Sequence, residues 1–110
     1  MQLDRIDLNL FVVLDAIFTE GGITRASDKL HLTQPAVSHA LNRLRRLFDD
    51  ALFVREGRRL VPTPRARALI EPVRAALRGL EVTLSESQAF DAARSTRRFT
   101  LGVRDVLEAR

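Results

Sequence analysis

Residues 30–46 read LHLTQPAVSHALNRLRR, and this stretch decides the fold that we predict for the chain. Its apolar residues recur every three or four positions, which is typical of an amphipathic helix. Thr33, Gln34 and Pro35 precede the apolar pattern, and threonine followed by proline favours a helix start because the hydroxyl accepts from an orphan backbone amide. The sequence therefore predicts a helix over residues 34–48. Its other face carries glutamine, serine, histidine, asparagine and arginine, and that choice of side chains needs an explanation.

Two shorter helices are expected before this one. The first begins at Asp7, a typical cap residue, and ends at the glycine pair 21–22. The second covers residues 24–30 and is capped by Thr24. A three-residue turn then leads to the helix at 34–48, and two helices joined in this way form a helix-turn-helix unit. The core-facing side of the third helix is expected to consist of Val37, Ala40, Leu41, Leu44, Leu47 and Phe48.

A small hairpin and a long helix are predicted to follow. Two extended runs, 52–55 and 60–62, flank a turn at residues 56–58 with a basic tip. Thr63 and the proline after it repeat the cap-and-proline start. The long helix is predicted to run to about Gln88.

The apolar residues of the long helix form a heptad seam. Their spacing alternates between four and three, which gives a narrower stripe than a core helix has and favours a partner helix. Pro72 and Gly79 interrupt the seam. The predicted dimerisation residues are Ile70, Val73, Leu77, Leu80 and Leu84.

Composition excludes several classes of protein. The 110 residues allow one modest domain and an appendage, and the apolar content of 45% argues against disorder. The apolar runs are too short to span a bilayer, and the acidic N-terminus argues against a secretory signal. Cysteine is absent, which removes disulfides and thiolate catalysis and fits a cytoplasmic protein. We expect no catalytic residue, cofactor or metal.

Positive charge is concentrated around the opening stretch. Residues 25–67 hold ten basic and four acidic residues, whereas residues 1–24 hold one basic and four acidic ones. Such a patch attracts a polyanion and releases its counterions on contact. In a helix-turn-helix unit the second helix lies in the major groove of DNA. The side chains that would face the groove here are Gln34, Pro35, Ser38, His39, Asn42 and Arg43.

These side chains suit the reading of bases. Glutamine and asparagine bond adenine bidentately, arginine bonds guanine or a phosphate, and proline offers an apolar edge to a thymine methyl. For the helix alone, a polar solvated face is an equally good interpretation. The cap, the turn and the hairpin favour DNA, because a basic hairpin at this place acts as the wing of winged helix-turn-helix proteins and tracks phosphates or enters the minor groove. The predicted wing contacts are Arg55, Arg58 and Arg59.

Two other classes of function fit the sequence less well. An enzyme would have to use His31 and His39, which lack metal-ligand spacing and have no nucleophile in a recognisable order. A pure interaction protein is the stronger alternative, because the seam alone predicts helix pairing. The DNA-binding interpretation includes the seam and also explains the cap, the polar face and the basic hairpin.

The sequence resembles the DNA-binding region of LysR-type transcriptional regulators. The resemblance covers residues 5–88 and rests on DLNLFVVLDAI, GGITRASDKLHLTQPAVSHALNRLRRLF and DALFVREGRRLVPTPRA. It implies a mainly α winged helix-turn-helix domain, with three helices and a two-stranded wing, followed by a linker helix that pairs antiparallel with that of a second subunit. It also implies a C-terminal effector domain. The stretch RRFTLGVRD resembles the first strand of that domain. The family's DNA contacts fall on Thr33, Gln34, Pro35, Ser38, His39 and Arg43, with wing contacts at Arg55 and Arg58.

Two positions depart from the family pattern. Ala26 and Ser27 stand where many relatives have paired alanines, a change that should be tolerated, and His39 stands where many have arginine. RLRRLFDDALFVREGRRLVPTPRA further resembles the branch of nodulation and aromatic-degradation regulators, which implies a small aromatic or phenolic inducer.

The expected organisation has three parts. Residues 1–62 form the winged domain, residues 63–88 the linker and dimerisation helix, and residues 89–110 a linker and the first strand of a truncated effector-binding domain. The expected partners are double-stranded DNA, a second copy of the chain, further copies in a tetramer of the full-length protein, and the inducer. The expected location is the cytoplasm, at the nucleoid.

Overall fold

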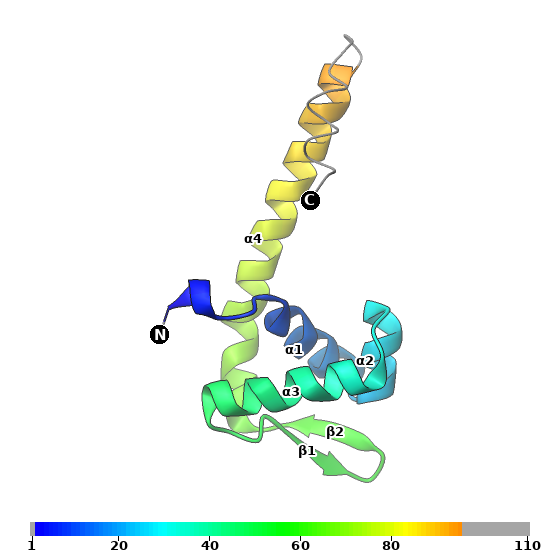
Figure 1. Ribbon diagram of the computed structural model, residues 1–110, viewed down its shortest axis with the longest axis vertical. Helices are drawn as coiled ribbons and strands as arrows, with labels where there is room; N and C mark the ends of the chain where they lie inside the picture. The colour runs from blue at the N-terminus through cyan, green and yellow to red at the C-terminus, as the bar shows by residue number, and fades with distance from the viewer. Residues whose placement is uncertain (1, 96–110) are drawn as a thin grey trace. The chain divides into compact units, whose positions relative to one another are not determined.

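The computed structural model describes residues 2–95, which form helices and a small two-stranded sheet (Figure 1). The chain divides into two compact units, Met1–Ala76 and Leu77–Arg110. The first holds a winged helix-turn-helix fold, as the sequence predicts, and it also includes the amino-terminal part of α4. In chain order the elements are a 3₁₀ turn at Leu3–Arg5, α1 at Asn9–Glu20, α2 at Ile23–Leu30, α3 at Gln34–Phe48, β1 at Phe53–Glu56, β2 at Arg59–Pro62 and α4 at Pro64–Ser95.

Local signals determine both ends of α1. The helix begins at Asn9 with Leu8 as its N-cap, two residues after the predicted start at Asp7. The Asp7 carboxylate still accepts a hydrogen bond from the N–H of Asn9 at 3.0 Å, so it satisfies one of the amides that the first turn leaves free. Gly21 ends the helix at φ +76°, a conformation that glycine adopts without a side-chain clash. Its N–H donates to the carbonyl of Ile17 at 2.8 Å.

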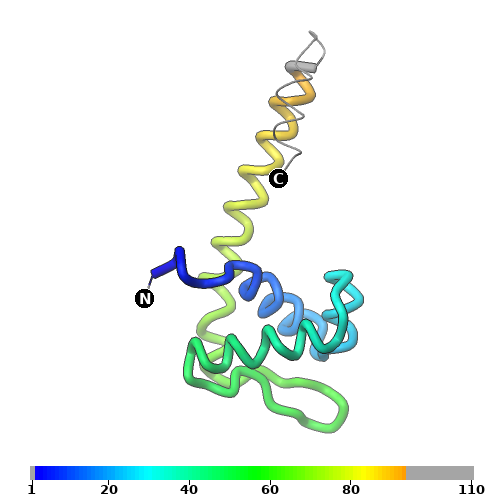
Figure 2. Tube along the Cα trace, in the orientation of Figure 1, coloured from blue at the N-terminus to red at the C-terminus, as the bar shows by residue number. Residues whose placement is uncertain are grey.

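The turn between α2 and α3 follows the prediction. His31 ends α2 in the left-handed conformation at φ 57°. The Thr33 hydroxyl accepts from the N–H of Ala36 at 3.2 Å, which confirms Thr33 as the cap of α3. Figure 2 shows the chain reversing between the two helices. Helix α3 therefore begins where the opening stretch predicts.

The predicted cap of α2 is wrong. The helix begins at Ile23, and its N-cap is Gly22, which has an extended backbone and no side chain to donate or accept. The Gly22 carbonyl already accepts from the N–H of Ala26 at 3.1 Å, so the first helical turn starts one residue before the threonine. Thr24 instead uses its carbonyl to accept the hydroxyl of Ser27 at 2.7 Å. That bond satisfies the hydroxyl of Ser27, which is buried, so a polar side chain fits at this position of the core.

The hairpin differs by one residue from the prediction. β1 and β2 are antiparallel, and Glu56 pairs with Arg59, so the turn consists of Gly57 and Arg58 rather than residues 56–58. Gly57 has φ +64°, which the first position of a two-residue hairpin turn favours. Leu52 lies before β1 rather than in it.

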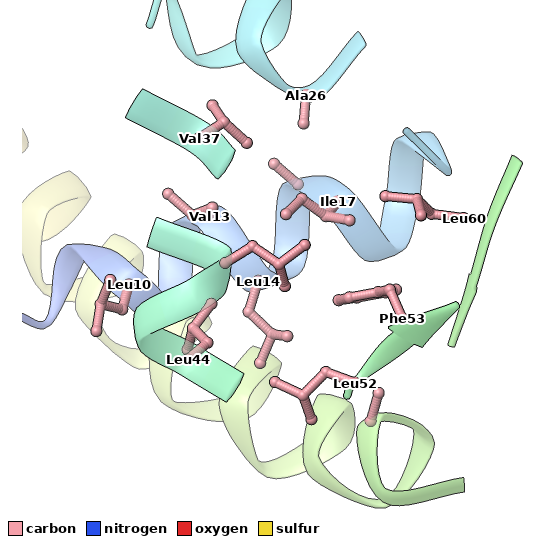
Figure 3. Close-up of a cluster of buried hydrophobic side chains, with 13 residues drawn as sticks. Leu10, Val13, Leu14, Ile17, Ala26, Val37, Leu44, Leu52, Phe53 and Leu60 are labelled. Atoms are coloured by element: carbon pink, nitrogen blue, oxygen red, sulfur yellow. The ribbon is translucent and has the colours of Figure 1, made fainter. Parts of the chain in front are cut away.

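A single cluster of apolar side chains holds the winged domain together (Figure 3). α1, α2, α3, the hairpin and the start of α4 all contribute to it. Of the six residues predicted on the inner side of α3, Val37, Leu41 and Leu44 are buried, while Ala40, Leu47 and Phe48 are half-buried. The fully or nearly fully buried members are Leu10, Val13, Leu14, Ala16, Ile17, Ala26, Val37, Leu41, Leu44, Leu52, Phe53, Leu60 and Ala66.

The amino-terminal part of α4 is tied to α1. Thr63 caps the helix, because its hydroxyl accepts from the N–H of Ala66 at 3.2 Å. Nε of Arg74 donates to the carboxylate of Asp15 at 2.7 Å, and the guanidinium lies 5.1 Å from the centre of the Phe18 ring. Ile70 is only 4% exposed, so most of its side chain is covered within the chain itself.

The second unit is described here as far as Ser95 and consists of the rest of α4. The helix continues past the predicted end at Gln88, so the prediction that residues 89–95 belong to a linker is wrong. Glutamate, glutamine and alanine are good helix formers, and no glycine or proline interrupts residues 80–95. The predicted strand after residue 98 lies outside the described residues. Within them, no helix is long and apolar enough to cross a membrane.

Candidate nucleic-acid interface

The outer side of α3 presents the side chains that the sequence singled out. We call Thr33, Gln34, Pro35, Ser38, His39, Asn42 and Arg43 the recognition face. All of them are exposed except Arg43, which is half-buried. The opposite side of the same helix carries Val37, Leu41 and Leu44 in the core. The helix is therefore anchored by one side and free to contact a partner with the other.

A polar groove joins the recognition face to the wing. Gln34 and Ser38, one turn apart on α3, line it together with the three wing arginines. The first residues of α2 close its other side, including Thr24 and Arg25. The fold thus brings together Gln34, Ser38, Arg55, Arg58 and Arg59, which the sequence predicted as two separate contact elements.

Backbone and core contacts position the wing. The N–H of Leu60 in β2 donates to the carbonyl of Gly21 at 2.9 Å, so the left-handed end of α1 also serves as an anchor for the hairpin. Phe53 in β1 is 1% exposed and packs edge-on against Phe18. The exposed arginines therefore extend from strands that are fixed on the inner side.

Ion pairs divide the basic residues into two groups. Arg25 and Lys29 both lie near the Glu20 carboxylate, at 3.6 and 3.7 Å. Arg43 lies 3.6 Å from a carboxylate oxygen of Asp7. By contrast, the wing arginines form no ion pair with any carboxylate of residues 2–95. Their positive charge is therefore available to a polyanion.

Two residues at the carboxyl-terminal end of the recognition face, Asn42 and Arg43, are engaged within the chain. His39 and Arg43 line a shallow pocket beside Asp7 and Asn9 at the start of α1. Asn42 is exposed, but its Oδ1 accepts from Nη1 of Arg45 at 3.3 Å. Gln34, Pro35 and Ser38 have no such contact with another side chain of residues 2–95. The free part of the face is thus its first turn, which in a helix-turn-helix reaches base edges.

Asp50 connects the end of α3, the wing and α4. One carboxylate oxygen accepts from the N–H of Leu52 and from the hydroxyl of Thr63, both at 2.8 Å. These two bonds, with help from the charge of Arg65, hold the pKa of Asp50 below its ordinary value, although partial desolvation opposes them. The carboxylate therefore favours the folded chain while it is ionised.

The structure adds residues that the sequence prediction missed. Thr24 and Arg25 line the groove, and Arg45 bonds the segment that leads into β1. Arg25 could have been noticed because it is the first basic residue of the positively charged segment 25–67. Arg45 gave no such signal, because its partners depend on the backbone course of residues 51–53. The described residues contain no group of histidines and acids that could hold a metal ion.

The fold and the exposed face define a winged helix-turn-helix domain. Residues 8–67 match the family described as "Bacterial regulatory helix-turn-helix protein, lysR family". The chain therefore belongs to the LysR family of bacterial regulators.

Relatives and solved structures agree with this assignment. Nodulation protein D 1 of Bradyrhizobium sp. (strain NC92) is 48% identical over 107 residues, which cover 97% of this chain and 34% of that protein. A probable transcriptional regulator of Pseudomonas aeruginosa is 46% identical and superimposes with a TM-score of 0.73, covering 76% of this chain and 28% of that one. The CbnR DNA-binding domain, solved in a complex with DNA, has a TM-score of 0.67 at 21% identity and shares the fold, over 78% and 99% of the chains. The chain spans about a third of the length of the curated relatives it matches.

Proposed function

We propose that this chain is the DNA-binding part of a transcriptional regulator and that it recognises a specific operator sequence. The groove that joins Gln34 and Ser38 to three arginines, none of which pairs with a carboxylate of residues 2–95, is the observation that carries the proposal. In it, uncharged side chains suited to base edges lie beside charges suited to phosphates. The first turn of α3 enters the major groove, and the wing lies on the adjacent backbone or minor groove.

The division of labour follows the contacts of each side chain. Gln34 reads a base, since it is exposed and no other side chain of residues 2–95 bonds it. Thr33 caps α3 and approaches a phosphate, as the helix start favours an anion. Pro35, Ser38 and His39 complete the reading face. Asn42 and Arg43 contribute only after they release Arg45 and Asp7, so we assign them a secondary role.

The protein acts as a dimer on two half-sites. Leu80 and Leu84 are 58% and 62% exposed on α4, and a leucine seam of this kind favours a second helix. Leu77 is half-buried and adjoins them. Ile70 and Val73 belong instead to the inner side of the helix, so the pairing surface begins later than the sequence seam. Two copies related by a twofold axis read an inverted repeat.

The longer protein responds to a small molecule. Relatives named nodulation protein D favour the branch in which we expect an aromatic or phenolic inducer. That ligand would bind outside the described residues. DNA binding places the regulator at the nucleoid in the cytoplasm, and no catalytic role is assigned to His31 or His39.

Selection from a random-sequence DNA library tests the proposal. Duplexes retained by the protein should share a motif made of two related half-sites in inverted orientation. Retention of duplexes without a shared motif would contradict sequence recognition. Retention of none would leave helix pairing as the function and would support the interaction-protein alternative.

A further inference from the structure

A strained turn lies between the recognition helix and the wing. Leu52 has φ +63°, and the N–H of Phe53 donates to the carbonyl of Ala51 at 2.6 Å, which closes a three-residue turn around Leu52. Such turns with positive φ at their centre are rare and strained, and more so for a bulky residue. The Leu52 side chain is 0% exposed. A conformation of this kind persists only where the surrounding contacts enforce it.

Arg45 on α3 supplies two of those contacts. Its Nε donates to the carbonyl of Ala51 at 2.7 Å, and its Nη2 donates to the carbonyl of Phe53 at 3.0 Å. A guanidinium is planar and rigid, so one side chain holds both acceptors in a fixed geometry. The bond from Nη1 to Asn42 further orients the group. Arg45 thereby joins the recognition helix to the first strand of the wing.

The strand register explains why the Phe53 carbonyl is available. Glu56 pairs with Arg59 beside the two-residue turn, and Phe53 pairs with Pro62 three steps further along the ladder. Hydrogen-bonded and non-bonded pairs alternate along an antiparallel ladder, beginning with a bonded pair at the turn. The Phe53 pair is therefore a non-bonded one. Its carbonyl faces the outer edge of β1, where Arg45 meets it.

Asp50 and Thr63 hold the same turn from the other side. The carboxylate of Asp50 accepts from the N–H of Leu52 at 2.8 Å. The carbonyl of Leu52 accepts from the N–H of Thr63 at 2.9 Å. Both backbone groups of Leu52 are thus bonded, and the turn can rotate only if several hydrogen bonds break together.

We propose that Arg45 is a positioning residue for DNA recognition, because it fixes the wing to the recognition helix through the carbonyls of Ala51 and Phe53. The inference rests on the proposed function of the groove. Three nitrogens of Arg45 are bonded within the chain, so it acts through the wing arginines rather than on DNA itself. A wing that is held in place loses less conformational entropy when DNA binds. Its arginines then meet the DNA backbone at a fixed distance from Gln34.

A double-mutant cycle separates this role from a general contribution to folding. Arg45→Met keeps the apolar stem and removes the fork, and Arg58→Ala removes one wing contact. The two single variants, the double variant and the unsubstituted protein are titrated against a duplex carrying the selected motif and a random-sequence duplex of equal length. Circular dichroism establishes that each is folded at the titration temperature.

Arg45→Met should weaken binding to the selected duplex by about tenfold, the loss typical of a charged group's hydrogen bonds. The loss of affinity caused by Arg58→Ala should then be several-fold smaller in the Arg45→Met background than in the unsubstituted protein, because a wing that is not fixed does not hold Arg58 against the DNA. Arg46→Met is the matched control, since Arg46 is the exposed neighbour on α3 with the same charge. It should leave the effect of Arg58→Ala unchanged.

Arg45→Lys tests whether charge alone is sufficient, and it replaces Arg45→Met if the latter does not fold. Lysine keeps the charge but lacks the fork, so binding should fall and the coupling to Arg58 should be lost. If Arg45→Lys bound DNA as tightly as the unsubstituted protein, the proposal would be overturned. Strictly additive losses of affinity for the Arg45 and Arg58 substitutions would also overturn it. A failure of the proposed function is distinct from both outcomes, because the unsubstituted protein would then select no motif.

Discussion

Asp7 at the start of α1 and Arg43 on the recognition helix lie 3.6 Å apart, carboxylate oxygen to guanidinium nitrogen. Each side chain is about two-fifths exposed, at 42% and 41%, so water screens the pair and it contributes little to stability. We expect the pair to affect DNA affinity more than stability, because Asp7 neutralises one positive charge on the recognition face that meets the DNA.

Asp7→Asn should therefore strengthen binding to any duplex. Asparagine can still accept from the N–H of Asn9, so the helix start survives while the charge is removed. We expect a gain of about threefold at low salt that shrinks as salt rises. Asp4→Asn removes the same charge from an exposed neighbour and is the control. Equal gains for the two variants in fluorescence anisotropy would show that the pair with Arg43 is irrelevant.

Arg58→Ala should weaken binding to all sequences alike. Its side chain lies in the hairpin turn, exposed and without a carboxylate partner among residues 2–95, and a phosphate contact there releases a counterion. The slope of log K against log salt should fall in magnitude by about one. Arg78→Ala, at an exposed position on α4, should leave the slope unchanged. An unaltered slope for Arg58→Ala would remove the wing tip from the set of phosphate contacts.

Asp50 should give the fold a defined dependence on pH. Its pKa is lowered in the folded chain, so its contribution to stability is present above the ordinary carboxyl range and disappears as pH falls through the folded value. Asp50→Asn should reduce the free energy of unfolding at neutral pH, and the difference should close below about pH 4. Urea titrations at several pH values measure it. Asp49→Asn serves as control, and a difference for Asp50→Asn that stays constant with pH would contradict the assignment.

Leu80→Asp should convert dimers to monomers. The leucine is 58% exposed on the seam of α4, and a carboxylate there would be buried without a partner in a paired helix. Val82→Asp is the matched control, since Val82 is similarly exposed, at 55%, but lies off the seam. Sedimentation velocity at several protein concentrations distinguishes the species. Monomers for both variants, or dimers for both, would place the pairing surface elsewhere.

Most of the winged domain follows from local sequence signals. Thr33 and Thr63 each stand before a proline-containing first turn, and both cap as expected, because the bond that a cap makes lies within three residues. The apolar spacing of α3 likewise defines which side enters the core. These features need no knowledge of the rest of the chain.

The errors arise where short-range rules compete. Thr24 is a good cap residue, but Gly22, which lies two residues before it, has the extended backbone of an N-cap, and α2 therefore begins at Ile23. Residues 89–95 read as part of a linker because most of them are small or polar, yet alanine and arginine continue a helix without difficulty. In the first case the neighbouring glycine determined the result, and in the second the helix propensity of the residues outweighed their small size and polarity.

The contacts that tune the site depend on the course of the folded backbone and could not be predicted. Arg43 meets Asp7 across the domain, and Arg45 meets carbonyls whose direction depends on the left-handed Leu52. A sequence gives the charge of these arginines but not their partners. The contacts of Asn42 and Arg43 within the chain are visible only once it is folded.

The central claim is that Gln34 reads a base, and the specificity ratio of Gln34→Ala tests it most directly. Affinities for the selected duplex and for a random-sequence duplex are measured for this variant, for the unsubstituted protein and for Gln88→Ala, which changes an exposed glutamine on α4. The account predicts a loss of about 1–3 kcal/mol on the selected duplex alone, with Gln88→Ala unchanged. Equal losses on both duplexes, or no loss on either, would contradict it.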